Sequence, residues 1–289
     1  MQLSASPDQY SNGEAVRAWN LYTGDPHKRT AEYGDTLVRL LRARGVRTVL
    51  DAAAGIGVDS LLLLSKVFKV TSVDLNDGMV EEMKKERVKR GLEDWQIGNG
   101  DWLDLEHAKV THPKGGYDAV ICIGNSFAHL PDSSPDQRIH RLAISNFRAL
   151  LRPGGTLVID HRNYDYIVTH GAIPNTNSKL YYQGGDRIHS LKTELEKGEE
   201  GKVTQITLRY EIDMRGHTRG DEEMRATQSG EQIPVCAFTL TYFPHLLGKF
   251  LELLSGVFGK GADHVVLEDF KEVLVRVETP SYFIHLIRK

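Results

Sequence analysis

The sequence predicts an α/β fold in which a mostly parallel, seven-stranded sheet carries an antiparallel β insertion. Three observations support this prediction. An apolar strand at 48–51 runs into a glycine turn and an apolar helix. Apolar strands then alternate with helical patterns as far as residue 166, and after residue 167 the pattern changes to the period of two that is typical of antiparallel strands. A chain of 289 residues suits one large domain with an insertion, or two small domains.

The glycine turn is the first candidate binding site. Gly55 and Gly57 allow the backbone to approach a ligand closely, and Asp74, which ends the second strand, can accept hydrogen bonds from ribose hydroxyls. The third glycine of a dinucleotide fingerprint is missing, because Ser60 stands in its place. An acid before the turn, Asp51, disfavours a pyrophosphate but is compatible with a cationic ligand. The turn therefore favours S-adenosylmethionine over NAD, and a strand-turn-helix without a ligand is the alternative.

The overall composition excludes several classes of protein. The net charge of −3 gives no basic field that would indicate nucleic acid or an acidic membrane as a partner. The two cysteines, Cys122 and Cys236, lie in apolar runs without metal-binding spacing, which is typical of buried thiols in a reducing compartment. No apolar run is long enough to span a bilayer, and the start has no signal-peptide pattern. We expect a soluble cytoplasmic protein without a metal.

The first 45 residues are rich in aromatic side chains. Tyr10, Trp19 and Tyr22 are either packing anchors or the walls of a pocket. Arg29 precedes a helix whose apolar face begins at Tyr33, and this arginine is either a solvated charge or a ligand for a carboxylate.

The second half of the parallel region supplies further candidates. A helix is predicted over 77–90 and a short strand near 95–97, followed by a loop in which Asp101 adjoins Trp102. An acid beside an indole could accept from an adenine amino group and stack on its ring, although alone the pair only indicates a turn. Ser134 is the expected N-cap of the next helix.

Two strands bring polar residues to one edge of the predicted sheet. The apolar strand at 117–123 ends at Gly124, Asn125, Ser126 and His129, and the strand at 156–160 leads to Arg162. Open α/β sheets bind ligands at the carboxyl ends of such strands. An arginine there is a forked receptor for a carboxylate.

The region 167–244 is predicted to be an antiparallel insertion that acts as a lid. Strands are expected at 206–212 and 238–242, with a polar loop at 215–231 between them. Tyr182, Tyr210 and Tyr242 therefore face either the ligand edge or the packing of the small sheet. A helix at 246–257 and strands near 272–277 and 281–287 complete the core. The predicted units are 1–45, an arm over the cofactor site; 46–166, the cofactor-binding core; 167–244, the lid; and 245–289, which completes the sheet.

Several runs of sequence resemble the glycine N-methyltransferase family. The matching runs lie at 7–10, 13–15, 19–25, 29–33, 120–132, 160–166 and 282–285, and together they span nearly the whole chain. Gly-Asn-Ser-Phe-Ala-His and His-Arg-Asn-Tyr-Asp-Tyr are the specific ones. A terminal antiparallel strand is also a trait of Rossmann-like class I methyltransferases rather than dehydrogenases, which is a fold-level analogy.

The resemblance implies roles for individual residues. Cofactor binding would fall to Tyr10, Trp19, Tyr22, Arg29, Ala53, Gly55, Asp74, Asp101, Trp102, Ile123, Asn125, Ser126 and His129. The acceptor would contact Tyr22, Gly124, Asn125, His129, Arg162 and Tyr182, with Arg162 on the glycine carboxylate. The reacting amine would lie among the hydroxyls of Tyr10, Tyr22, Tyr182, Tyr210 and Tyr242. The predicted catalytic set is Tyr10, Asn125, Arg162, Tyr182, Tyr210 and Tyr242. The family often has asparagine where this chain has Asp101.

The resemblance also implies an activity. Methyl transfer from S-adenosylmethionine to glycine would give sarcosine and S-adenosylhomocysteine, and a homotetramer would be expected. The family's inhibitory folate site is in doubt, because Ser4 stands about where vertebrate members carry a glutamate on a longer arm. Two alternatives stay open: a glycine/sarcosine N-methyltransferase of betaine synthesis, and a non-enzymatic regulator that binds the cofactor or folate.

Overall fold

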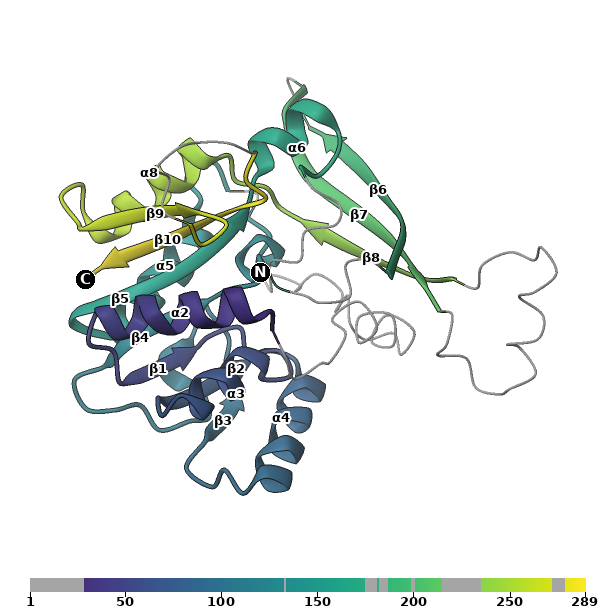
Figure 1. Cartoon of the computed structure of the whole chain (residues 1–289). Coiled ribbons are helices and arrows are strands. Elements are labelled where there is room, and N and C mark those ends of the chain that lie inside the picture. Colours follow the sequence, from purple (N-terminus) through teal and green to yellow (C-terminus); the bar gives the residue numbers. More distant parts are fainter. Residues whose placement is uncertain are drawn as a thin grey trace, which may run out of the picture.

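A seven-stranded sheet forms the centre of the computed structural model (Figure 1). Its strands are β1 (Thr48–Asp51), β2 (Lys69–Asp74), β3 (Gln96–Asn99), β4 (Tyr117–Cys122), β5 (Leu151–Arg162), β9 (His264–Glu268) and β10 (Tyr282–Arg288). They are ordered β3-β2-β1-β4-β5-β10-β9; β1 to β5 are parallel, and β10 pairs antiparallel with both its neighbours. The structure describes residues 29–132, 134–174, 181, 187–198, 201–214, 235–271 and 279–289.

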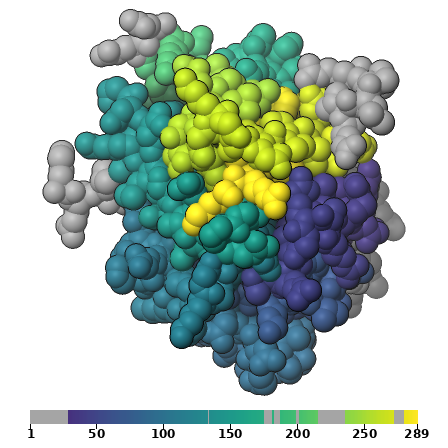
Figure 2. Space-filling view, turned by 90° about the vertical axis from the view of Figure 1, so that its left-hand side faces the viewer, coloured from purple at the N-terminus to yellow at the C-terminus, as the bar shows by residue number. Residues whose placement is uncertain are grey.

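Helices cover both faces of this sheet, which explains the continuous apolar character of its strands. On one face α2 (Ala31–Ala43), α3 (Val58–Ser65) and α4 (Asp77–Arg90) pack on Val49, Val70 and Ile121. On the other face α5 (Arg138–Leu150) and α8 (Leu247–Phe258) pack on Leu50, Val120 and Ile159. In Figure 2 the yellow C-terminal end of the chain lies between the yellow-green segment with α8 and β9 and the teal and purple segments.

The antiparallel insertion forms a separate three-stranded sheet, ordered β6-β7-β8, that extends from the core beside α6 (Tyr164–His170) (Figure 1). Its strands are β6 (Ile188–Lys197), β7 (Val203–Asp213) and β8 (Val235–Tyr242). Alternate residues of β7 and β8 are buried, and they pack with Tyr164 and Ile167 of α6. The predicted strands at 206–212 and 238–242 are therefore confirmed, while β6 and α6 were not predicted. The expected loop at 215–231 lies outside the described residues.

The start of α5 differs from the prediction, and one predicted strand is not described. The helix expected after Ser134 begins only at Arg138, because Gln137 is left-handed at φ 53° and Asp132 accepts the N–H groups of Ile139 and His140. The strand expected near 272–277 lies outside the described residues, and the partner of β10 among the described residues is β9. Within the described ranges no helix is long and apolar enough to cross a membrane.

A row of three histidines, of which His161 and His285 are buried, crosses the sheet beneath α8. His264 Nε2 lies 3.0 Å from His285 Nδ1, and His285 Nε2 lies 3.1 Å from His161 Nδ1. The ring of Phe250, from α8, packs on His161 with centroids 4.5 Å apart. Burial lowers the pKa of His161 to about 3 and that of His285 well below 6.5, so both imidazoles are neutral at pH 7.

Candidate active site

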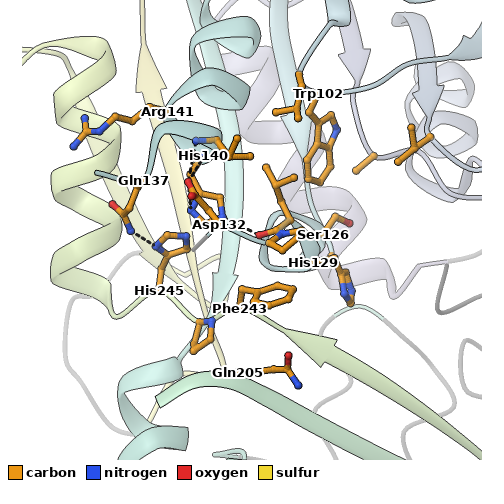
Figure 3. Close-up of a pocket in the computed structure, with 18 of the residues that line it drawn as sticks. Trp102, Ser126, His129, Asp132, Gln137, His140, Arg141, Gln205, Phe243 and His245 are labelled. Atoms are coloured by element: carbon orange, nitrogen blue, oxygen red, sulfur yellow. Dashed lines mark hydrogen bonds and ion pairs between the residues drawn. The ribbon is translucent and has the colours of Figure 1, made fainter. Parts of the chain in front are cut away.

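A cavity of about 1810 Å³ opens at the carboxyl ends of β1, β2 and β4. Many of the residues predicted to bind the cofactor or the acceptor line it: Arg29, Ala53, Gly55, Asp74, Asp101, Trp102, Ile123, Gly124, Ser126 and His129. The cavity continues past α5 to His140 and His245, whose side chains are shown with Trp102 and His129 in Figure 3. Ligands bind at this edge of open α/β sheets.

The acid at the end of β2 holds the glycine turn in place. One carboxylate oxygen of Asp74 accepts the backbone N–H of Gly55 at 2.8 Å, and the other accepts that of Asn76 at 2.9 Å. Gly55 and Gly57 have φ angles of 55° and 85°, and a Cβ at Gly57 would lie 2.7 Å from the Trp95 ring. The turn therefore requires glycine, and a carboxylate has further lone pairs with which to contact a ligand in the cavity.

Trp102 forms a flat wall of the cavity. Its indole N–H donates to the carbonyl of Ala52 at 2.5 Å, and its ring stacks on Phe127 with centroids 5.9 Å apart. The neighbouring Asp101 is exposed, and its carboxylate accepts the N–H of Leu103. The fixed indole suits stacking with a planar ring, and the acid beside it can accept from an amino group.

Arg29 is held by a carboxylate that the sequence did not indicate. Its Nε and Nη2 donate to the two oxygens of Asp59 at 3.0 and 2.6 Å. The hydroxyl of Tyr33 donates to the same carboxylate at 2.8 Å. Asp59 stands in the first turn of α3, so the glycine turn and Arg29 are tied to one element. This pair orients the arginine at the margin of the cavity.

Asp51 has a different surrounding from the one that the sequence argument assumed. It is buried, and it accepts a hydrogen bond from Ser60 at 2.7 Å; Ser60 in turn contacts Ser72, which accepts from Trp95. Burial raises the pKa of Asp51 to about 7. A carboxyl that is half protonated at pH 7 contributes less negative charge to the cavity than an ionised acid, so it supports a cationic ligand less strongly.

The residues predicted to bind the acceptor stand at the ends of β4 and β5. Asn125 follows β4 in the left-handed conformation, with φ 62°, and its amide oxygen accepts the backbone N–H of Arg162 at 2.9 Å. Its amide nitrogen donates to the Tyr164 hydroxyl at 2.8 Å. Because the Asn125 side chain is buried in these contacts, it fixes the end of β5, and its contact with the ligands stays a prediction.

Arg162 is a buried cation with aromatic neighbours. Its side chain is 7% exposed, its guanidinium lies 5.0 Å from the Tyr282 ring and 5.8 Å from the Tyr242 ring, and it interacts electrostatically with Tyr210. Its Nε makes no hydrogen bond within the part of the chain that the structure describes. A buried charged donor without an acceptor is costly, so an anion such as a carboxylate would be a suitable partner for this guanidinium.

His129 contributes a neutral ring to the same region. Its Nδ1 lies 2.9 Å from the carbonyl of Thr241, to which the neutral imidazole donates, and its ring packs on Tyr242 with centroids 4.6 Å apart. Burial lowers the pKa of His129 to about 4, so it adds no positive charge to the cavity at pH 7.

The described structure thus contains only part of the predicted set of site residues. Tyr10, Trp19, Tyr22 and Tyr182 lie outside the described residues. Three buried residues near Arg162 and Asn125 were missed by the sequence analysis: Asp160, Tyr164 and Tyr181. Asp160 and Tyr164 lie in the matching run 160–166 and could have been suspected from it, but Tyr181 was not indicated by any local pattern.

Comparisons with known proteins define the class of this fold. Residues 49–155 match the family model described as a methyltransferase domain. A solved S-adenosylmethionine-dependent methyltransferase from Clostridium acetobutylicum has a TM-score of 0.60 at 14% identity, covering 89% of this chain and 90% of that one. The fold is that of a class I S-adenosylmethionine-dependent methyltransferase.

Sequence similarity is more specific. Glycine N-methyltransferase from Rattus norvegicus is 43% identical over 288 residues, 98% of this chain and 93% of that protein. Glycine/sarcosine N-methyltransferase from Aphanothece halophytica is 34% identical over 188 residues, 64% of this chain and 63% of that protein. The chain belongs to the glycine N-methyltransferase family.

Proposed function

We propose that this chain transfers a methyl group from S-adenosylmethionine to the amino group of glycine, giving sarcosine and S-adenosylhomocysteine. The observation that carries the proposal is Arg162, a buried guanidinium whose Nε lacks a hydrogen bond within the described residues, at the edge of the sheet where ligands bind. A small carboxylate would supply the missing acceptor. The full-length similarity to the rat enzyme supports glycine as its source.

The residues that line the cavity fit S-adenosylmethionine. Asp74 would accept from the ribose hydroxyls, Trp102 would stack on the adenine, and Asp101 would accept from its amino group. Arg29, oriented by Asp59, would bind the carboxylate of the methionine part. When bound, S-adenosylmethionine supplies a methyl group on a sulfonium, which is already a good leaving group.

The protein's contribution to the reaction is then mainly orientation, which can lower a barrier by roughly 7–11 kcal/mol. Arg162 would fix the glycine carboxylate, so that the amine lies among the hydroxyls of Tyr210 and Tyr242. Oxygen acceptors there would hold the N–H groups and leave the nitrogen lone pair directed at the methyl group. The amine must lose one proton before attack, and a water or a tyrosine hydroxyl would take it.

The alternative is a broader glycine/sarcosine N-methyltransferase. Relatives of that name match at 34–35% identity, but each over only 56–64% of this chain, whereas the rat glycine N-methyltransferase matches over 98%. This difference favours glycine as the principal acceptor. The homotetramer, the folate inhibitor and the cytoplasmic location stay predictions, as do the roles of Tyr10, Trp19, Tyr22 and Tyr182.

Product analysis by mass spectrometry tests the proposal. Purified protein is incubated with S-adenosylmethionine and with glycine, sarcosine or dimethylglycine in separate tubes. Sarcosine formed from glycine, with little further methylation, is the expected result. Efficient conversion of sarcosine would favour the broader enzyme, and cofactor binding without turnover of any of the three amines would contradict methyl transfer to this class of acceptor.

A further inference from the structure

A fully buried carboxylate lies directly behind the acceptor site. Asp160, near the end of β5, is 0% exposed. Its two oxygens lie 2.9 and 3.0 Å from the backbone nitrogen of Asn125, and the hydroxyl of Tyr181 donates to it at 2.7 Å. None of the roles assigned above uses this carboxylate, although a buried acid is retained only where donors satisfy it.

The hydrogen bonds that Asp160 accepts hold an unusual piece of backbone. Gly124 and Asn125 are consecutive left-handed residues, with φ angles of 85° and 62°. For a residue with a side chain this conformation is unfavourable, and it persists only where the surroundings enforce it. Gly124 lines the cavity, and Asn125 accepts the N–H of Arg162. The carboxylate thus fixes the turn that separates the two ligand regions, and the turn fixes the end of β5.

Tyr181 extends this arrangement toward the cofactor side. Its ring packs edge-on against Tyr33 with centroids 5.1 Å apart, and the guanidinium of Arg29 lies 5.8 Å from its centre. Tyr33 in turn donates to Asp59, which holds Arg29. The ring of Tyr181 therefore contacts Tyr33, which helps to hold Arg29 through Asp59. Its hydroxyl contacts Asp160, the carboxylate that holds the acceptor turn.

We propose that Asp160 and Tyr181 are positioning residues, which hold the Gly124–Asn125 turn and through it Arg162 in the geometry that the methyl acceptor requires. The inference rests on the proposed function in so far as the acceptor is glycine. Neither residue touches the reacting atoms; they act through the backbone of Asn125.

The protonation of Asp160 provides a signature of this role. Burial raises the pKa of Asp160 to about 6, and the hydrogen bonds from Tyr181 and Asn125 oppose the increase. A protonated carboxyl is a weaker acceptor, so kcat/KM for glycine should fall as the pH decreases through this pKa. The titratable groups that interact with Asp160 are Tyr33, Cys122, Arg162, Tyr164 and Tyr181.

Two variants of the full chain test the proposal. Tyr181→Phe keeps the ring against Arg29 and removes the donor to Asp160, and Asp160→Asn keeps the shape but removes the charge. We expect each to raise the KM for glycine by about tenfold or more, while the KM for S-adenosylmethionine changes by less than about twofold. In Tyr181→Phe the acidic limb of the kcat/KM profile should move to higher pH, because a hydrogen bond that stabilises the carboxylate is lost.

Asp118→Asn is the matched control. Asp118 also accepts backbone N–H groups, those of Arg47 and Thr48, but it lies at the start of β4, at the opposite end of the sheet. This variant should leave both KM values and the acidic limb unchanged.

The outcomes separate this inference from the proposed function. If wild type methylates glycine and both variants keep its KM and pH profile, the inference is wrong and the proposed function stands. If wild type does not methylate glycine, or if a variant is too unstable for kinetics, crystal structures of the two variants decide. A Gly124–Asn125 turn that keeps its left-handed angles and the bond to the Arg162 N–H would overturn the inference, and a rearranged turn would support it.

Discussion

Acidification from pH 7 to pH 5 should destabilise the fold, because buried neutral histidines resist protonation in the native state. Burial lowers the pKa of His161 and His245 to about 3, that of His129 to about 4, and that of His285 well below 6.5. A histidine whose pKa is lowered by folding stabilises the folded state above its pKa in the unfolded chain, which is about 6.5. This contribution is lost as the pH falls below that pKa. His129, His161 and His245 therefore each cost about 2 kcal/mol at pH 5, and His285 acts in the same direction.

Two buried acids act in the opposite direction. Burial raises the pKa of Asp51 to about 7 and that of Asp160 to about 6, so their contribution is fully present at low pH and is lost as the pH rises through these values. Between pH 7 and pH 5 they regain about 4 kcal/mol, whereas His129, His161 and His245 together lose about 6 kcal/mol and His285 adds to this loss. We expect the free energy of unfolding to fall by at least about 2 kcal/mol over this range.

Urea unfolding at pH 7, 6 and 5 measures this dependence. In His161→Gln, unfolding should take up about one proton fewer than in wild type. The slope of the free energy of unfolding against pH should therefore be smaller by about 1.4 kcal/mol per pH unit below pH 6. His107→Gln is the control, because His107 is exposed and its hydrogen bond to Asp104 raises its pKa instead of lowering it. If wild type and His161→Gln show the same slope, the imidazole is already protonated in the folded state and the reasoning is refuted.

Three further predictions concern ligands. Arg162→Lys should raise the KM for glycine about 100-fold without a comparable change in the KM for the cofactor, because a point charge replaces a buried guanidinium with two parallel donors. The control, Arg152→Lys at an exposed side chain, should leave the KM for glycine unchanged. An unchanged KM in Arg162→Lys would remove Arg162 from the acceptor site. Asp59→Asn should raise the KM for S-adenosylmethionine about tenfold by releasing Arg29, and an effect on glycine alone would contradict this. Trp102→Phe should weaken S-adenosylhomocysteine binding in calorimetry by about tenfold; equal affinity would exclude the stacking role.

The parts of the fold that could be predicted have local signals. The helix predicted over 77–90 has the observed bounds of α4, because Asn76 caps its start and Gly91 ends it in the left-handed conformation. By contrast, β6 is half exposed and has a register shift near Ser190, so its apolar residues do not alternate cleanly. The start of α5 was predicted too early because its N-cap, Gln137, is left-handed and the N–H groups of its first turn are accepted by Asp132, six residues before the first helical residue.

The same distinction applies to the site. Gly55, Asp74 and Trp102 could be found because a strand, a turn and an acid follow one another at characteristic spacings. Asp160 and Tyr181 meet across 21 residues, and Asp160 meets Asn125 across 35. Such contacts depend on how β4 and β5 pair and on where the chain returns, and a pattern confined to a short window does not contain that information.

The pairing of β5 also has a consequence for the evolution of acceptor range. Asp160 and Arg162 are on one face of this strand and His161 is on the other, and hydrogen bonds to β4 and β10 fix the strand from both sides. A slip of one residue would exchange a carboxylate and a guanidinium for an imidazole, so the floor of the site resists gradual change. New amines are therefore more readily accommodated through Tyr210 and Tyr242, which belong to the outlying sheet and can vary without disturbing the register of the core.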